Sequence, residues 1–478
     1  MDGIEGKEYD EVGYLVFSPD SGRVAYSAKS GGKGFVVVDD REGVKYDSIF
    51  WPIFSPDGRR VAYEAGRSNK RLVVIDGVEG KEYGFISGAL AFSPDSQRMA
   101  YVALHRYEVL GEPQCVVVDG VEGKEYDAIG TVFFSPDSRR IAYVAHRGGK
   151  QVAVVDDAEG KEYDEVRNLV FSPDSGRVAY YAESGVKSFA VVNGREGVKY
   201  DSISLPIFSP DSRRVAYEAH RGGKQVAVVD DAEGKEYDGV GNLVFSPDSG
   251  RVAYRARRGR KSCVVVDGIE GKEYDGVGNL VFSLDSGRVA YRALLGRKDL
   301  VVVDGVEGKE YEYDFDIYFS RIGTPVFSPD SRRVAYVAKL GRKRVVVVVD
   351  GVEGKKYGYD DLVSERITPI FSPDSRRIAY VMHISGGMSV VVDGVEGKKY
   401  DWIAVDPVFS PDSSCVAYLA WASRGYKQVV VVDGAEGKWY SGFLKTSRLV
   451  FDNPRHLHAL AYRGEEIFRV ETEIVIYD

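Results

Sequence analysis

Hydrophobic and polar residues follow one another in short blocks, and one block pattern repeats along the chain. From Leu243 the sequence reads LVFSPDSGRVAYRARRGRKSCVVVDGIEGKEYD, which contains four strand-sized pieces separated by turn signals. Pro-Asp-Ser-Gly divides the first pair, a Gly- and Lys/Arg-rich tip the second, and Asp-Gly the third. VAY and VVVD are apolar on successive residues, so both faces of these strands are expected to be buried. No segment keeps a helical period for ten residues, and the pattern therefore predicts an all-β chain.

The same unit recurs along the whole sequence. Most copies begin 37 or 38 residues apart, and steps of 42 to 45 mark longer loops. Self-similarity at this period is typical of proteins built from stacked supersecondary units. Ten copies carry F-S-P-D and two carry variants of it; they begin at Phe17, Phe54, Phe92, Phe134, Phe171, Phe208, Phe245, Phe282, Phe327, Phe371, Phe409 and Phe451.

Such a unit is too small to fold alone. A four-stranded sheet with two apolar faces needs a neighbour on each side, and closing the row into a ring removes the exposed ends. The predicted fold class is therefore all-β: one or more β-propellers built from twelve four-stranded antiparallel blades of about 37–45 residues. An open β-solenoid is the alternative, but solenoid coils are shorter and lack hairpin turns at three places in each unit.

The repeat also carries a family resemblance. F-S-P-D-S-x-R-[VI]-A-Y followed by a VVVDG strand resembles the TolB-type, WD40-like (PD40) propeller repeat over essentially the whole chain. The resemblance implies a fold more than an activity, because such propellers serve as adaptors, as periplasmic complex subunits and as gating domains of peptidases. The sequence departs from the last group because no α/β-hydrolase domain follows the repeats.

The number of blades predicts more than one ring. Single rings usually hold four to eight blades, so the simplest division is six plus six. Blades 1–6 then occupy residues 1–240 and blades 7–12 occupy residues 241–478. Seven plus five, eight plus four and one large ring stay open, because units four to eight follow one another without a linker. The longer connections lie at residues 311–324 and 357–368.

Composition narrows the class of partner. Hydrophobic residues at 44% and charged residues at 29% are typical of soluble globular proteins, and a net charge of −9 disfavours nucleic-acid binding. No apolar run reaches 18 residues, so membrane insertion is not expected.

The sequence as given shows no signal peptide, which predicts the cytoplasm. Met1 lies in mid-repeat, however, so a missing upstream leader is the alternative; oligomeric state has no sequence signal.

Catalytic motifs are missing from the sequence. G-x-S-x-G, H-E-x-x-H and C-x-x-C do not occur, which predicts that the chain is not an enzyme and uses no cofactor. His146, His220 and His383 share one repeat position in non-adjacent blades. They are expected to lie too far apart for one metal ion, so no metal site is predicted.

The three cysteines are too few for a disulfide framework. Cys115 and Cys263 begin Val-rich strands where other copies carry Phe or Leu, which is the pattern of a small buried hydrophobe. Cys415 instead replaces an Arg beside a turn, and is expected to be the accessible thiol.

Positions that vary between copies predict a binding face. In a propeller, the connections between blades and the tips of the second hairpin share one face, and both vary here. The tips are rich in Lys and Arg, which favours an acidic partner, although basic tips also serve solubility alone. Aromatic residues are expected to act as anchors. The candidate residues are Tyr14, Trp51, Asn168, Asn242, Arg257, Arg258, Arg260, Lys261, Asn279, Trp402, Asp406 and Arg448.

Three functions follow from these patterns. The leading hypothesis is a non-enzymatic scaffold that presents a propeller face to a protein partner. The first alternative is binding of a polyanion, either nucleic acid or an acidic polysaccharide, by the basic tips, with a steep salt dependence. The second is a hydrolase- or lyase-type enzyme whose active site lies at a channel mouth and is assembled from several blades.

Overall fold

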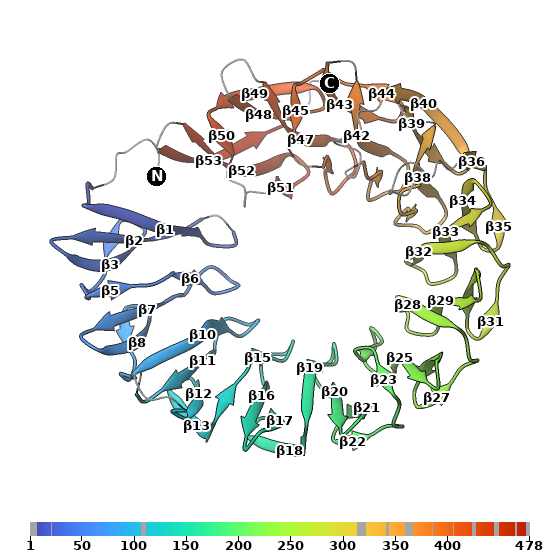
Figure 1. Cartoon of the computed structure of the whole chain (residues 1–478). Helices are drawn as coiled ribbons and strands as arrows, with labels where there is room; N and C mark the ends of the chain where they lie inside the picture. Colours follow the sequence, from blue (N-terminus) through green and yellow to red (C-terminus); the bar gives the residue numbers. More distant parts are fainter. Residues whose placement is uncertain are drawn as a thin grey trace. The chain divides into compact units, whose positions relative to one another are not determined.

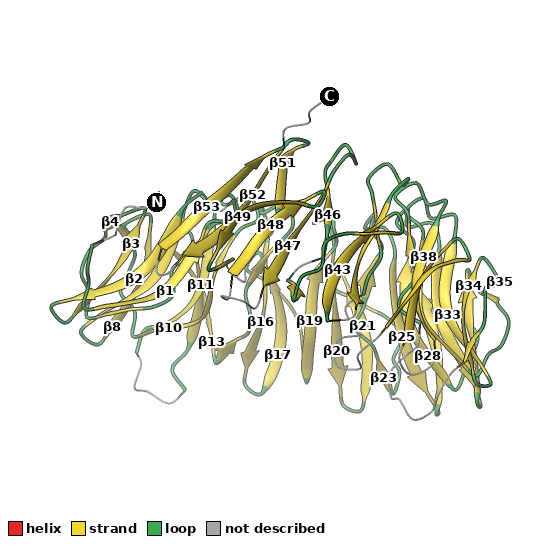
Figure 2. Cartoon of the chain, turned by 90° about the horizontal axis from the view of Figure 1, so that it is seen from above, coloured by secondary structure: helices red, strands yellow, loops and turns green. Residues whose placement is uncertain are grey.

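The computed structural model is all-β. Its described residues form twelve antiparallel sheets and no helix (Figure 2), which confirms the predicted fold class of a β-propeller chain built from four-stranded blades. Over those residues there is accordingly no helix long and apolar enough to cross a membrane. The structure describes residues 7–20, 22–106, 111–312, 322–340, 344–358, 367–384, 386–404, 406–422, 427–443, 449–463 and 466–474.

The second and third strands form the centre of each blade, and their lengths scarcely change from copy to copy. The second strands are β2 (Val24–Ser30), β7 (Val61–Arg67), β11 (Met99–Leu104), β16 (Ile141–Arg147), β20 (Val178–Ser184), β25 (Val215–Arg221), β29 (Val252–Arg258), β33 (Val289–Leu295), β38 (Val334–Leu340), β42 (Ile378–Ile384), β47 (Val416–Ala422) and β52 (His456–Arg463). The third strands are β3 (Lys33–Val38), β8 (Lys70–Ile75), β12 (Gln114–Val118), β17 (Lys150–Val155), β21 (Lys187–Val192), β26 (Lys224–Val229), β30 (Lys261–Val266), β34 (Lys298–Val303), β39 (Arg344–Val349), β43 (Gly387–Val392), β48 (Lys427–Val432) and β53 (Glu466–Glu473).

The first and fourth strands are shorter or interrupted. First-strand segments are β1 (Glu11–Phe17), β5 (Ser48–Ile49), β6 (Ile53–Phe54), β10 (Phe85–Phe92), β14 (Ala128–Ile129), β15 (Phe133–Phe134), β19 (Glu165–Phe171), β23 (Ser202–Ile203), β24 (Ile207–Phe208), β28 (Gly239–Phe245), β32 (Gly276–Phe282), β37 (Val326–Phe327), β41 (Ile370–Phe371), β45 (Trp402–Ile403), β46 (Val408–Phe409), β50 (Gly442–Phe443) and β51 (Val450–Asn453). Fourth-strand segments are β4 (Arg41–Glu42), β9 (Val78–Glu79), β13 (Val121–Tyr126), β18 (Ala158–Tyr163), β22 (Arg195–Glu196), β27 (Ala232–Glu233), β31 (Ile269–Glu270), β35 (Val306–Glu307), β36 (Tyr311–Glu312), β40 (Val352–Gly358), β44 (Val395–Glu396) and β49 (Ala435–Tyr440).

Strand order within a blade follows the chain, as the turn signals predict. In the seventh blade the order is β28-β29-β30-β31, each strand antiparallel to the next. Asp267 and Gly268 have φ angles of 52° and 79°, the left-handed pair of a two-residue type I′ hairpin. The Asp-Gly signal therefore makes the predicted turn between the third and fourth strands.

The hydrophobic core lies between neighbouring blades. One cluster joins Ala142 and Ala153 of the fourth blade to Val166, Leu169 and Phe189 of the fifth. Both faces of a central sheet are therefore buried, which explains why its strands are apolar on successive residues. Within each unit defined below, the sheets lie side by side in chain order, with first strands along one edge (Figure 1).

The F-S-P-D-S-x-R motif joins each blade to the next. In the second blade, the Arg60 guanidinium donates to Asp76 Oδ2 of its own sheet at 2.9 Å and to the Gln97 carbonyl of the next at 2.8 Å. The same guanidinium lies 5.6 Å from the ring centroid of Phe92, the motif Phe of the third blade. The repeated Arg and Phe are thus parts of one inter-blade contact.

The E-G-K-E-Y segment joins the blades again at their outer edge. Tyr126, at the end of β13, donates its hydroxyl to Glu159 of the next blade at 2.8 Å. Its ring lies edge-to-face against Tyr143 at 6.1 Å between centroids. The repeated Tyr and Glu of this segment thus have structural roles. Burial also raises the pKa of Tyr143, the tyrosine of β16 against which Tyr126 packs, to about 12.

The chain divides into two compact units. One comprises Glu5–Gly223 with Val228–Glu233, and the other Lys224–Ala227 with Gly234–Asp478 and the first four residues. The division of the twelve blades into rings at residue 240 stays a prediction. Most of the longer connections, at residues 311–324 and 357–368, lies outside the described residues.

Candidate functional site

The hairpin tips and the connections between blades do lie together, as the sequence predicts. The Asp275 carboxylate, in the connection after the seventh blade, accepts the backbone N–H of Gly296 at the eighth tip at 2.6 Å. It also accepts a bond from Lys261, at the base of the seventh tip, at 2.7 Å. These two bonds lower the pKa of Asp275. One carboxylate thus joins two successive tips.

Much of the basic charge on these tips is compensated. Arg258 contacts Glu270 through both terminal nitrogens, at 2.6 and 3.0 Å, and lowers the pKa of that carboxyl to about 2. Arg257 donates to the Asp238 carbonyl oxygen at 3.1 Å. Arg260 is exposed. Two of the four predicted cluster cations, Arg258 and Lys261, are therefore paired with carboxylates of the chain, which weakens the field of the cluster at a distance.

The three candidate asparagines all occupy a special backbone position. Asn168, Asn242 and Asn279 have φ angles of 47°, 56° and 52°, each at a bulge in the first strand. Asn tolerates this left-handed conformation better than most residues do. Their presence has a sufficient backbone reason without a ligand.

Tyr14 occupies the same bulge position in the first blade, with a φ angle of 48°. A bulky side chain in this region costs about 1–2 kcal/mol. Its ring stacks on Trp51 of the second blade at 4.5 Å between centroids and an interplanar angle of 30°. Trp51 is still 64% exposed and Tyr14 44% exposed. We call these two residues the aromatic pair.

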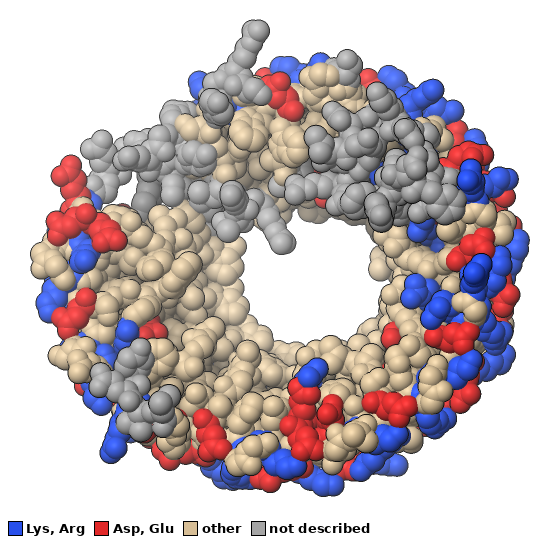
Figure 3. Space-filling view, viewed as in Figure 1, with Lys and Arg blue, Asp and Glu red and all other residues tan. Residues whose placement is uncertain are grey.

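The aromatic pair lies on an edge that carries little charge. In the unit that contains β1 to β25, the surface along the first strands is mostly uncharged, whereas basic and acidic residues alternate along the opposite edge (Figure 3). Leu205, the equivalent of Trp51 in the sixth blade, is also exposed, at 44%. The pair therefore differs from its surroundings in being aromatic, not in being apolar.

The remaining candidates belong to other blades than the aromatic pair. Trp402 is half-buried in β45, opposite Trp421 of β47, and packs against a core cluster. Asp406 is exposed beside the strand β46. Arg448 lies outside the described residues. His146, His220 and His383 belong to three different sheets.

The expectation for Cys415 is wrong. Its side chain is buried, as are those of Cys115 and Cys263. Cys415 packs in the cluster formed with Phe443, Leu449 and Leu457 of the last blade, so a small apolar group fills the place of the motif Arg. Burial raises the pKa of the Cys415 thiol.

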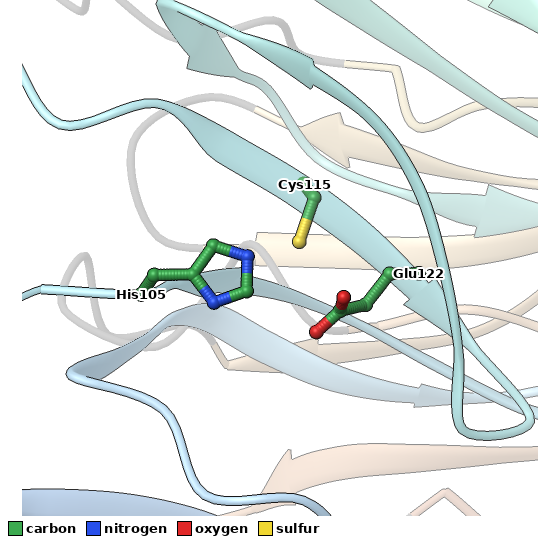
Figure 4. A group of neighbouring side chains, drawn as sticks. All are labelled: His105, Cys115 and Glu122. Carbon is green, nitrogen blue, oxygen red and sulfur yellow. The ribbon is translucent and has the colours of Figure 1, made fainter.

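A second group of chemically active side chains lies in the third blade. His105 follows β11, Cys115 lies in β12 and Glu122 in β13, and one ligand atom from each lies within 4.8 Å of the other two. Their side chains point toward one another (Figure 4). We call this set the His-Cys-Glu group. It is the one such group of His, Cys and carboxylate residues found in the part of the chain that the structure describes.

Spacing along the sequence does not reveal the His-Cys-Glu group, because His105 follows β11 whereas Cys115 and Glu122 lie in β12 and β13. A signal is present when the copies are aligned. His105 takes the position at which other second strands carry Arg67, Arg147, Arg221 or Arg258. Those arginines pair with the Glu that corresponds to Glu122.

Similarity to known proteins is found among solved structures. No family model matches the sequence, and no curated protein matches it significantly. Among solved structures, the chain is similar to a eukaryotic initiation factor, with 10% identity over 70% of this chain and 96% of that one, at a TM-score of 0.35. It is also similar to the Dos1 propeller (12%, 61% and 89%, TM-score 0.30) and to the β-propeller domain of the trilobed protease from Pyrococcus furiosus (15%, 57% and 98%, TM-score 0.25). At these values the similarities carry no inference about activity.

Proposed function

We propose that the chain is a non-enzymatic scaffold that presents a propeller surface to a protein partner, with Tyr14 and Trp51 as anchors. The observation that carries the proposal is the aromatic pair itself: a left-handed Tyr stacked on an exposed Trp. Strain of this kind concentrates at functional positions. Exposed aromatic residues are enriched among the hot spots of protein interfaces.

The residues that recur in most copies of the repeat are consistent with a scaffold. Its Ser, Asp, Arg, Tyr and Glu residues hold turns or join neighbouring blades, as the contacts of Arg60 and Tyr126 illustrate. These polar groups are therefore already engaged in structural contacts. A role as an adaptor or complex subunit also agrees with the TolB-type repeat that the sequence resembles.

The pairing of tip charges favours a protein partner over a polyanion. Arg258 and Lys261 are each within 2.7 Å of a carboxylate oxygen of the chain itself. A phosphate or sulfate ligand must compete with these carboxylates for the same cations. A partner that contacts the uncharged first-strand edge meets no such competition.

The test uses residues that the chain already carries at equivalent positions. Y14N installs the Asn of the fifth, seventh and eighth blades, and W51L installs the Leu of the sixth. Both variants are expected to fold, as checked by circular dichroism and thermal unfolding. Proteins cross-linked to the wild-type chain in an extract of its source cells are quantified by mass spectrometry. A partner bound through the aromatic pair is expected to drop at least ~10-fold with W51L.

L205A is the matched control, because it truncates an exposed side chain at the same strand position of another blade. A partner lost with W51L and retained with L205A supports the proposal. An interaction profile unchanged by both Y14N and W51L contradicts it. Binding to heparin or to a DNA oligonucleotide that weakens steeply with salt and is unaffected by W51L would favour the polyanion alternative instead.

A further inference from the structure

The His-Cys-Glu group brings three metal-ligand types to one point of the third blade. Cys115 pairs with Ala103 in the sheet register, and Glu122 pairs with Val117. Both residues therefore lie on strands whose positions the hydrogen-bonded ladder fixes. His105 follows directly after the last residue of β11. The three side chains converge on one face of the sheet (Figure 4).

Another blade that carries the same Cys and Glu has an Arg in place of His105. In the seventh blade, Cys263 and Glu270 correspond to Cys115 and Glu122, and Arg258 corresponds to His105. Arg258 neutralises Glu270 through two bonds at 2.6 and 3.0 Å. In the third blade the fixed positive charge of the Arg is replaced by an imidazole, which can bind a cation. The substitution thus replaces the Arg partner of this Glu with a side chain that can itself bind a metal ion.

We propose that His105, Cys115 and Glu122 bind a zinc-class divalent cation. Imidazole nitrogen, thiolate sulfur and carboxylate oxygen are the ligands that Zn²⁺ takes, whereas Mg²⁺ and Ca²⁺ prefer oxygen alone. Thiolate and carboxylate together supply two negative charges, which match those of the ion. Zn²⁺ with three protein ligands takes a fourth from water or from another side chain.

The geometry requires a small closure. Metal–ligand bonds of about 2.0–2.3 Å in a tetrahedron place the donor atoms about 3.3–3.8 Å apart. The present separations of up to 4.8 Å must therefore shorten by about 1 Å. His105 follows the end of β11, and its side chain is 38% exposed. Its Nε2 also lies 3.6 Å from Glu125 Oε1, which places a further carboxylate beside the group.

Binding requires two local exchanges. Cys115 Sγ lies 3.7 Å from the Ala103 carbonyl oxygen, to which the thiol donates. On binding, the S–H bond breaks, the sulfur bonds to the metal, and the proton passes to solvent. Lys81 contacts Glu122 Oε1 at 2.8 Å, so the metal must take Oε2 or displace this lysine. Ion binding then joins three strands at one point.

The test measures metal binding by the whole chain directly. Co²⁺ is added to metal-free protein, and the absorption band from thiolate-to-cobalt charge transfer is recorded; Zn²⁺ binding is measured by calorimetry. We expect one site per chain, with the cobalt band displaced by Zn²⁺. C115V, which installs the Val152 of the fourth blade, is expected to abolish the band. H105R, which copies Arg258, is expected to weaken Zn²⁺ binding at least ~10-fold.

C263V is the matched control, because it removes the Cys of a blade that has Arg in place of His. It is expected to leave the cobalt band and the Zn²⁺ affinity unchanged. Absence of a thiolate band in the wild-type chain would overturn the proposal, as would a band that survives C115V or disappears with C263V. If C115V fails to fold, an unchanged Zn²⁺ affinity in H105R serves as the contradicting result.

Discussion

Neighbouring residues of one type have different roles according to their partners. Arg59 and Arg60 are adjacent in the second blade, yet the Arg59 side chain is 85% exposed and lies 4.0 Å from Asp57. Arg60 instead bonds to its own blade and to the next, and lies against a Phe ring. Repetition of the motif Arg therefore reflects inter-blade attachment rather than a charged surface for a ligand.

This difference predicts the cost of removing each side chain. We expect R60A to lower the free energy of unfolding by about 1.5–3 kcal/mol, because it removes hydrogen bonds made by a charged group and a contact with Phe92. R59A is expected to stay within about 0.5 kcal/mol of wild type. Urea-induced unfolding of both variants measures the difference. If R60A changed the free energy of unfolding as little as R59A, the hydrogen bonds between blades would not contribute to stability.

At the scale of an element, the first strand differs from the other three. In most blades it is bulged by a left-handed residue or interrupted before a proline such as Pro52 or Pro206. In the fourth blade it is interrupted between β14 and β15 without a proline. Proline lacks the N–H needed in a continuous ladder, so the two sequence types lead to the same loss of regularity. The sequence variation that predicted a binding face at Asn168, Asn242 and Asn279 is in part variation in how this strand is bent.

Substitutions at the bulge separate the backbone role from a binding role. N168V is expected to destabilise the chain by about 1–2 kcal/mol, because a β-branched residue is strained at a φ angle of 47°. N168G is expected to be nearly neutral, because Gly adopts this conformation freely. Thermal unfolding measures both effects. T131V is the control, because Thr131 is exposed and has no positive φ angle. It should change the stability little.

Loss of partner binding in N168G with unchanged stability would contradict a purely structural role for Asn168. The same result would support the role of Asn168 in the binding face that the sequence predicted. Retained binding in N168G together with reduced stability in N168V would confirm the backbone explanation.

At the scale of the whole molecule, the sequence predicted the fold much better than the site. Twelve copies of one turn-strand pattern each predict the same four-stranded sheet, so a misread element in one copy does not change the predicted fold. The buried Cys415 was predicted to be accessible because its burial depends on Phe443 and Leu457, which belong to another blade. The His-Cys-Glu group was missed for the same reason: contacts across strands are not visible in spacing along the chain.

Acid should weaken the molecule through the carboxylates at the outer edges of the blades. Arg147 lowers the pKa of Glu159 to about 2, and Glu270 is lowered to the same value by Arg258. These values lie below the pKa of about 4.3 in an unfolded chain. The stabilisation is therefore complete above about pH 4.3 and is lost as the pH falls through the folded-state value of about 2.

We accordingly expect the free energy of unfolding to stay level from pH 7 to about pH 5 and to fall steeply below about pH 4.5. Urea denaturation across this range measures it.

E159Q should lower the free energy of unfolding at pH 7. It should also make the fall in stability at acid pH less steep, because it removes one titrating group whose folded and unfolded pKa values differ. E162Q is a useful comparison, since Glu162 contacts the same Arg147 but shows a more exposed side chain, 47% against 20%. A stability curve that stays flat down to pH 2 would show that these pairs do not contribute to folding.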